Sequence, residues 1–146
     1  MPETDLGRLM LEAHRVLGDE FVEELNDRGY EDVRPGHSAV FMNIDRRSGT
    51  GLSELARRAR ITKQGMMLLV DELEGRGYVR RVPDPTDGRA KTVKLTARGR
   101  RYVAEARRVV AGIESRLRRE LGTRRYSELR TSLEWMAGLE EEQPGA

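Results

Sequence analysis

The sequence predicts a mainly α-helical protein with one small β-hairpin. Apolar side chains recur at helical spacing over long stretches near both ends of the chain. Between them, two short helical segments are separated by a tight turn, and a segment containing Pro83, Pro85 and Gly88 follows directly. The 146 residues suffice for one modest core, so we expect a single domain over residues 1–146.

The N-terminal stretch predicts one long amphipathic helix over residues 5–28. Asp5 can cap its start, and Gly29 can end it. Pro35 then opens a shorter helical stretch. The apolar stripe of the long helix consists of Leu6, Leu9, Ala13, Val16, Leu17, Phe21 and Leu25.

The middle of the chain predicts a helix-turn-helix. Residues 46–51 have the composition of a turn, and residues 52–60 have that of a helix. Thr62 is a good N-cap for a second helix over residues 63–77, which ends in glycines. The expected core stripe of this second helix consists of Met66, Leu69, Val70 and Leu73.

A β-hairpin is predicted directly after the second helix. Residues 78–82 and 90–95 are strand-like and flank the turn marked by proline and glycine. A single hairpin is not stable alone, so it must pack on the helices. A hairpin in this position is the wing of a winged helix-turn-helix.

Two further helices complete the expected fold. Thr96 can cap a long helix that reaches about Leu121, where Gly122 breaks it. A last helix carries an apolar stripe, and the stripes at both ends of the chain are too long for the surface of a monomer, which predicts a homodimer. The expected parts are dimerisation helices at about 5–32 and 115–139, a winged lobe at about 36–96 and a connecting helix at 97–121.

The composition excludes several kinds of site. The chain has no cysteine, which rules out disulfides and thiolate metal sites. His14 and His37 are too few for a histidine-built metal site, so we expect no metal and no cofactor. No carboxylate pair has a nearby nucleophile or phosphate loop, so we do not expect an enzyme. No apolar run approaches a membrane span, and no signal-peptide core begins the chain, which predicts a cytoplasmic protein without a membrane partner.

The charge is unevenly distributed along the chain. Residues 33–119 carry 21 basic and 9 acidic side chains, a net of +12, between two acidic ends. Such asymmetry is typical of proteins that bind a polyanion, although solvated helix faces are a simpler explanation. A winged-helix module for protein–protein interaction, without specific DNA binding, remains the alternative function. Such a module would not need a basic middle.

The central segment resembles the DNA-binding core of the MarR (multiple antibiotic resistance regulator) family. The matching pieces are "SELA" (53–56), "LVDELEGRGYVRR" (69–81), "DPTDGRAKTVKLT" (84–96) and "ARGRR" (97–101). The resemblance implies an obligate homodimer whose terminal helices intertwine and whose two winged lobes bind a palindromic DNA operator. It also implies a regulator of transcription, often a repressor released by a small, commonly aromatic, ligand.

The second helix and the wing supply the candidate contacts to double-stranded DNA. Lys63 and Gln64 are the polar side chains of its first turn and can read guanine and adenine. The family often has Ser, Thr or Arg where this chain has Gly65, Met67 and Leu68. We therefore expect specificity to depend on methyl contacts from Met67, on the wing and on DNA shape. One of Met67 and Leu68 is expected to face DNA or a neighbour. The full set of candidates is Ser53, Arg57, Thr62, Lys63, Gln64, Met67, Arg80, Arg81, Asp87, Arg89 and Lys91.

Three expectations concern particular arginines. Arg89 is expected to contact phosphate or the minor groove, with Asp87 bonded in the turn or orienting an arginine. Because Arg80 and Arg81 alternate faces on a strand, we expect one of the two to face DNA.

An effector pocket is expected only on the basis of the resemblance. It would lie between the first two helices, the fifth helix and the DNA-binding lobe. The candidate lining residues are His14, Tyr30, His37 and Met42, although structural or solvated positions are the more ordinary role for both histidines. Trp135 is expected to be a dimer or core aromatic residue.

Overall fold

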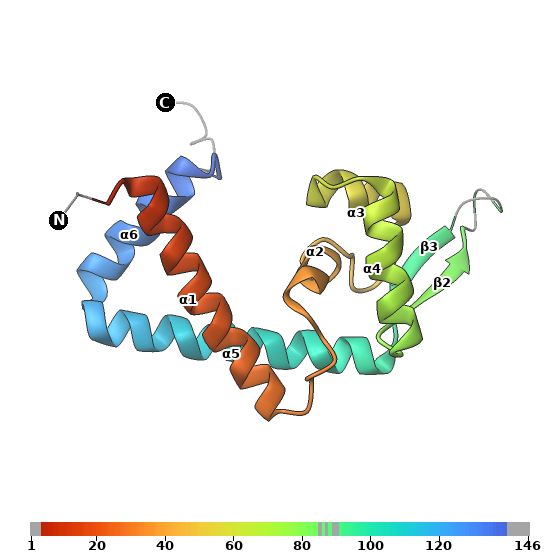
Figure 1. Ribbon diagram of the computed structural model, residues 1–146, viewed down its shortest axis with the longest axis horizontal. Helices are drawn as coiled ribbons and strands as arrows, with labels where there is room; N and C mark the ends of the chain where they lie inside the picture. The colour runs from red at the N-terminus through yellow and green to blue at the C-terminus, as the bar shows by residue number, and fades with distance from the viewer. Residues whose placement is uncertain (1–3, 85, 87, 89–90, 140–146) are drawn as a thin grey trace. The chain divides into compact units, whose positions relative to one another are not determined.

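A computed structural model describes residues 4–84, 86, 88 and 91–139 of the chain (Figure 1). The chain divides after Val109 into two compact units, which are described separately. The first unit contains α1 (Leu6–Asp27), the 3₁₀ helix η1 (Pro35–His37), α2 (Ser38–Phe41), β1 (Thr50–Gly51), α3 (Leu52–Ala59), α4 (Lys63–Gly75), β2 (Val79–Pro83), β3 (Lys91–Leu95) and the first half of α5 (Ala97–Leu121). The second unit contains the rest of α5 and α6 (Thr123–Met136).

The predicted fold class is confirmed. Helices dominate the described residues, and a small antiparallel sheet follows the α3–α4 pair in the order expected of a winged helix-turn-helix. No helix in the described part of the chain is both long and apolar enough to cross a membrane.

Side-chain caps set the starts of the helices where the sequence predicts them. The carboxylate of Asp5 accepts a hydrogen bond from the backbone N–H of Arg8 at 2.9 Å. The hydroxyl of Thr62 accepts one from the N–H of Gly65 at 3.0 Å. The hydroxyl of Thr96 accepts one from the N–H of Gly99 at 3.1 Å. Each cap satisfies a helical N–H that has no partner within its own helix.

The sheet has one more strand than the sequence predicts. Its order is β1-β3-β2, all antiparallel, with Val93 of β3 opposite Thr50 on one side and Arg81 on the other. The prediction that residues 46–51 form only a turn is therefore wrong at its last two residues. A two-residue strand has no alternating pattern to reveal it. Gly49, at φ +74°, brings the backbone so close to β3 that a Cβ there would lie 2.5 Å from the carbonyl oxygen of Val93.

The core of the first unit lies between α2, α3, α4 and the sheet. Three of the four residues in the predicted stripe of α4 (Met66, Val70 and Leu73) are fully buried, and Leu69 is half-buried. The other fully buried apolar residues of the lobe are Val40, Leu55, Tyr78, Val79 and Val93. Because the sheet packs against these helices, the wing has the support that a free hairpin lacks.

Four aromatic rings join α1, α2 and the start of α5 to the lobe. Tyr102 lies at the centre of this cluster, with ring centroids 5.2 Å from Tyr30, 4.4 Å from Phe41 and 5.8 Å from Tyr78. Gly99 allows this packing, because a Cβ at that position would lie 2.1 Å from the carbonyl oxygen of Tyr78.

The Tyr78 hydroxyl is bonded on two sides. It donates to Asp32 at 2.6 Å and accepts from Arg98 at 3.1 Å, while the Arg98 guanidinium also lies over the Tyr78 ring. The connection between α1 and η1 is thereby fixed to the base of the wing and to α5.

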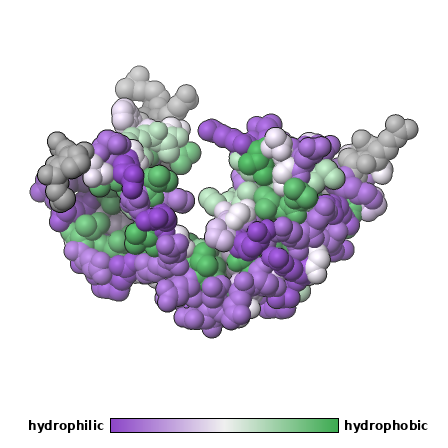
Figure 2. Space-filling model, viewed as in Figure 1, coloured by the Kyte–Doolittle hydropathy of each residue, from purple (hydrophilic) through white to green (hydrophobic). Residues whose placement is uncertain are grey.

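The second unit buries little of its apolar surface. Tyr126 is buried and packs under the guanidinium of Arg118, 4.8 Å from the ring centroid. The remaining large apolar side chains of α6 and the segment after it are exposed, namely Leu129, Leu133, Trp135, Met136 and Leu139. Figure 2 shows hydrophobic surface between hydrophilic residues on the terminal helices. The predicted last helix is confirmed, and much of the surface of its apolar stripe is exposed.

Candidate nucleic-acid interface

The turn between α3 and α4 is tight because one residue adopts the left-handed conformation. Arg60 has φ 57° and ψ 40°, and the N–H of Ile61 bonds to the carbonyl of Ala56 at 3.1 Å. This bond closes α3 in the manner of a helix C-terminal motif. Thr62 caps α4 directly afterwards, so the first turn of α4 lies at the surface.

The exposed side of α4 carries Lys63 and Gln64 in its first turn, followed by Met67 and Leu68. The side chains of Lys63 and Gln64 make no hydrogen bond to any other described residue, so their donors are available to a ligand. Met67 is 41% exposed and Leu68 is 65% exposed. This surface is the one that a helix-turn-helix inserts into the major groove.

The acidic residues in the second half of α4 are all bonded to basic groups. Arg81 donates to Asp71 at 2.5 Å and to Glu74 at 3.0 Å. Glu72 binds the guanidinium of Arg34 and also Nε2 of His37, which lies 2.7 Å away. The Arg34 hydrogen bond, followed by that from His37, lowers the pKa of Glu72 below its ordinary value. These bonds reduce the repulsion that bare carboxylates on α4 would exert on phosphate.

The two neighbouring arginines of β2 have different surroundings. Arg81 is 21% exposed, and its guanidinium is engaged by two carboxylates within the lobe. Arg80 is exposed, and its side chain makes no hydrogen bond or ion pair with another described residue. The expectation that one of the two faces DNA stays a prediction, and Arg80 is the one whose guanidinium is not engaged by a described residue.

The candidates on α3 form a cluster around one carboxylate. Glu54 binds Arg57 through both oxygens and Arg58 at 3.0 Å. The hydrogen bonds from Arg57, followed by those from Arg58, lower the pKa of Glu54 to about 2. Arg58 also donates to the backbone carbonyl of Asn43 at 2.8 Å, which leaves Arg57 as the more available cation. Ser53 is exposed on the same helix.

Two of the predicted wing contacts lie outside the described residues. Asp87 and Arg89 are in that part of the wing, and their roles remain predictions. At the start of the wing turn, the carboxylate of Asp84 accepts from the N–H of Thr86 at 2.8 Å and from its hydroxyl at 2.6 Å. Lys91 is exposed at the first position of β3.

His37 occupies a structural position. Its side chain is fully buried, Nδ1 accepts from the backbone N–H of Arg34 at 2.9 Å, and Nε2 lies 2.7 Å from Glu72. With both ring nitrogens engaged, His37 joins η1 to the middle of α4. Residues 37 and 72 are far apart in sequence, so no local pattern predicts this contact.

The other candidates for an effector pocket have dissimilar surroundings. Tyr30 packs in the aromatic cluster, Met42 is 82% exposed, and His14 lies exposed on α1. The expectation that these residues line one pocket with His37 is not supported by their positions.

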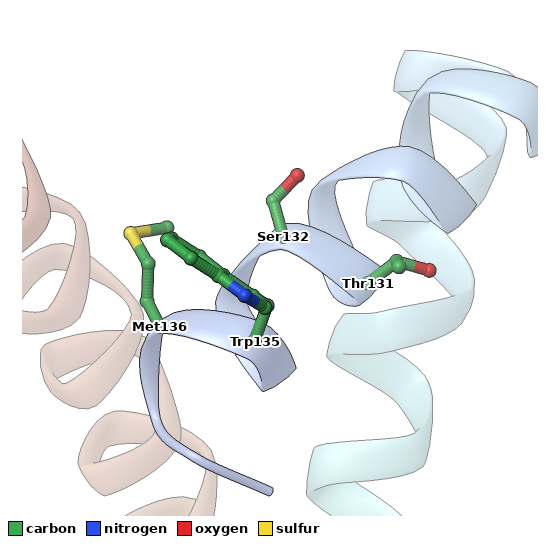
Figure 3. Close-up of a pocket in the computed structure, with 4 residues that line it drawn as sticks. All are labelled: Thr131, Ser132, Trp135 and Met136. Carbon is green, nitrogen blue, oxygen red and sulfur yellow. The ribbon is translucent and has the colours of Figure 1, made fainter. Parts of the chain in front are cut away.

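Two surface hollows occur elsewhere in the described part of the chain. One, of about 510 Å³, lies between the β1 turn and the base of the wing. The other, of about 380 Å³, is lined by Thr131, Ser132, Trp135 and Met136, and Figure 3 shows that all four side chains come from α6. Trp135 is 66% exposed and lies beside Met136 in Figure 3, so it is not a core residue within this unit.

Metal-ligating side chains do not gather in the region that the structure describes. No group of three or more His, Asp or Glu residues among the described positions could hold an ion. The acidic residues of the lobe are instead bonded to arginines, as for Glu54 and Glu72.

Comparison with known proteins identifies the family. The MarR-family sequence profile matches residues 31–90, from the connection after α1 into the wing. The HTH-type transcriptional repressor Rv2887 of Mycobacterium tuberculosis is 30% identical over 132 residues, which cover 90% of this chain and 93% of Rv2887. The chain belongs to the MarR family. It is a transcriptional regulator with a winged-helix DNA-binding lobe.

Solved structures of transcriptional regulators agree with the fold. The transcriptional repressor CouR, bound to a 23-mer DNA duplex, has a TM-score of 0.75 and 27% identity, with 91% of this chain and 92% of CouR covered. Rv2887 in complex with salicylic acid has a TM-score of 0.68 and 28% identity, with 92% and 98% covered.

One exposed residue of α4 is not among the DNA contacts that the sequence predicts. Leu68 was absent from the candidate contacts, although it is more exposed than Met67. Its position four residues after Gln64, and outside the core stripe, was the available signal.

Proposed function

We propose that this MarR-family regulator represses transcription by binding double-stranded DNA through α4 and the wing. The observation that carries the proposal is the asymmetry of α4. Lys63 and Gln64 are exposed and uncommitted among the described residues, whereas Asp71, Glu72 and Glu74 are all neutralised by bonded basic groups. The DNA complex of CouR supports the same use of the fold.

The proposed contacts fall into two classes. Gln64, Lys63 and Met67 approach base edges in the major groove, where sequence is read. The remaining contacts are to phosphate or the minor groove and fix the position of the lobe. They are Ser53, Arg57, Thr62, Arg80, Lys91 and Arg89, with Asp87 acting on the wing turn.

The regulator acts as a homodimer in this proposal. Large apolar side chains are exposed on α1 (Leu6, Leu9, Met10, Leu11 and Val16) and on α6 and the segment after it (Leu129, Leu133, Trp135, Met136 and Leu139). Stripes of this length on a soluble chain favour burial against a second copy. We assign dimerisation to about 5–32 and 115–139.

A two-fold dimer presents α4 twice. Each copy needs a major groove on the same side of the duplex, and such grooves recur about every 34–36 Å, or about 10–10.5 base pairs. The operator is therefore palindromic, with half-sites one helical turn apart. Since the regulator acts on chromosomal DNA, it works in the cytoplasm.

A small aromatic molecule is the proposed effector. The salicylic acid complex of Rv2887 supports this class of ligand. Binding that changes the spacing of the two lobes by a few ångströms displaces both α4 helices at once, so release is cooperative.

Selection of DNA from a random pool by the purified chain, followed by hydroxyl-radical footprinting, tests the proposal. We expect an enriched palindrome and two protected patches on one side of the duplex, about one turn apart. A single patch, or two patches half a turn out of phase, contradicts the dimer on a palindrome. Leu133→Asp should shift the protein to monomers in sedimentation experiments, while Glu128→Gln on the same helix should not.

A further inference from the structure

The exposed side of α4 is unusual in carrying two large apolar residues beside its polar first turn. Leu68 is 65% exposed and Met67 is 41% exposed, while Met66 and Val70 on the opposite side are fully buried. With 3.6 residues per turn, position 68 lies one turn beyond position 64 on the same line of the helix. Leu68 therefore continues the surface that Gln64 begins.

The lobe gives these two side chains no structural task. The core of α4 is complete without them, since Met66, Val70 and Leu73 already fill it. Two side chains are also far too small for a stable protein interface, which buries about 800 Å² on each partner. Their neighbours on α4 are Lys63 and Gln64, which favour a nucleic acid over an apolar protein surface.

Thymine offers an apolar group in the major groove. Its C5-methyl group lies at the groove edge, where apolar side chains distinguish thymine from cytosine. Gln64 is suited to the N6 and N7 atoms of adenine. Gln64 and Leu68, one turn apart on the same side of α4, can therefore contact an adenine and a neighbouring thymine through their edges in the major groove.

We propose that Leu68, flanked by Met67, is a specificity-determining residue that recognises thymine methyl groups next to the bases read by Gln64. The inference rests on the proposed DNA-binding function and adds the chemical basis of its sequence preference. In each half-site, one of the base pairs that face α4 in the major groove contains thymine. The C5-methyl group of that thymine is buried against the Leu68 side chain.

The expected size of the effect follows from methyl burial. Removing one buried methyl group weakens binding about fourfold, the factor that corresponds to about 0.8 kcal/mol. A dimer that buries one methyl in each half-site should therefore lose about 15-fold in affinity when both methyl groups are removed.

The experiment uses a duplex selected from a random pool by the purified full-length chain. Three versions of this duplex are synthesised. The first contains thymine throughout, the second has deoxyuridine in place of every thymine of the half-sites, and the third has deoxyuridine only outside the footprint. We expect the half-site deoxyuridine duplex to bind about 15-fold more weakly and the flanking one to bind normally. Leu68→Ala should bind the first two duplexes almost equally, because the methyl contact is already lost.

Arg80→Ala is the matched control. It removes a proposed phosphate contact, so it should weaken binding to the thymine and deoxyuridine duplexes by the same factor and keep their ratio unchanged. Equal affinity of the wild-type chain for the two duplexes overturns the methyl recognition but leaves the DNA-binding function standing. A ratio that persists in both Leu68→Ala and Met67→Ala also overturns it. Failure to enrich any DNA overturns both proposals.

Discussion

The winged lobe and the terminal helices bury their apolar side chains to very different extents. Leu55 and Leu73 in the lobe are fully buried, whereas Leu9 on α1 and Leu129 on α6 are 54% and 46% exposed. Both regions form regular helices, so helix propensity does not explain the contrast. The lobe completes its core within one chain, whereas the terminal helices leave apolar side chains exposed.

The ion pairs of charged side chains also differ between the lobe and the terminal helices. In the lobe, hydrogen-bonded charges join different elements, as in His37–Glu72 and Arg81–Asp71. On the terminal helices, most described ion pairs join residues three or four positions apart on one helix, as in Arg8–Glu12 and Arg124–Glu128. Local pairs stabilise a helix but do not position it. Lobe geometry is thus specified within the chain, and we infer that dimerisation specifies that of the terminal helices.

The largest expected effect on stability comes from replacing a buried leucine of the lobe, and an exposed leucine of α6 provides the comparison. Leu55→Ala removes a fully buried side chain and should lower the free energy of unfolding by about 2–5 kcal/mol. Chemical denaturation measures this loss. Sedimentation should show the dimer dissociation constant of this variant unchanged.

Leu129→Ala is the matched variant on α6. It should raise the dimer dissociation constant, because the leucine is exposed within one chain and buried only by a second copy in our proposal. An unchanged dissociation constant would remove the distinction between the two regions.

The sequence predicted the lobe better than the contacts within it. Periodicity and caps such as Asp5 and Thr62 are local signals, and the structure confirms the helices that they predict. The strand at Thr50–Gly51 and the His37–Glu72 contact depend on distant segments, so no local pattern reveals them. For the same reason the sequence could not tell Arg80 from Arg81, since only the structure shows which arginine meets carboxylates.

The second expected effect concerns Tyr78, which joins the α1 connection to the lobe. Tyr78→Phe removes the hydrogen bonds with Asp32 and Arg98 and should lower the free energy of unfolding at neutral pH by about 1–3 kcal/mol. Tyr102→Phe is the control, because the Tyr102 hydroxyl has no hydrogen bond to another described residue. The two variants should be compared by denaturation at pH 8.

The same tyrosines predict a loss of stability at alkaline pH. Burial, reinforced for Tyr78 by the hydrogen bond to Asp32, raises the pKa of both Tyr78 and Tyr102 to about 12. The ordinary value is about 10, so the folded state holds these protons more tightly than the unfolded state. Their contribution is complete below about pH 10 and is lost as the pH rises towards 12. Undiminished stability at pH 12 would contradict this.

A smaller effect distinguishes the neighbouring arginines of β2. Arg81→Ala breaks the bonds with Asp71 and Glu74 and should lower the free energy of unfolding by roughly 1 kcal/mol. Arg80→Ala should leave unfolding unchanged and flatten the salt dependence of DNA binding by roughly 0.9 log unit per log unit of salt for each lost phosphate contact. Denaturation and binding titrations at several salt concentrations measure both. The reverse pattern would place Arg81, rather than Arg80, on the DNA.

The smallest expected effect compares two exposed ion pairs, one in each region. Glu54 on α3 and Glu128 on α6 each bind an arginine on their own helix, so replacing either by glutamine should change stability little. Glu54→Gln should nevertheless tighten DNA binding a few-fold, because it releases Arg57 to phosphate and removes a negative charge from the lobe. Glu128→Gln should leave binding unchanged, since α6 lies outside the proposed interface.

Because the pKa of Glu54 is lowered to about 2, this carboxylate stays charged at any pH suitable for a binding assay, and the difference between the two variants should not depend on pH there. Equal affinities for the two variants would show that Arg57 does not contact the duplex, and would leave Ser53 as the proposed contact from α3 beside those of α4 and the wing.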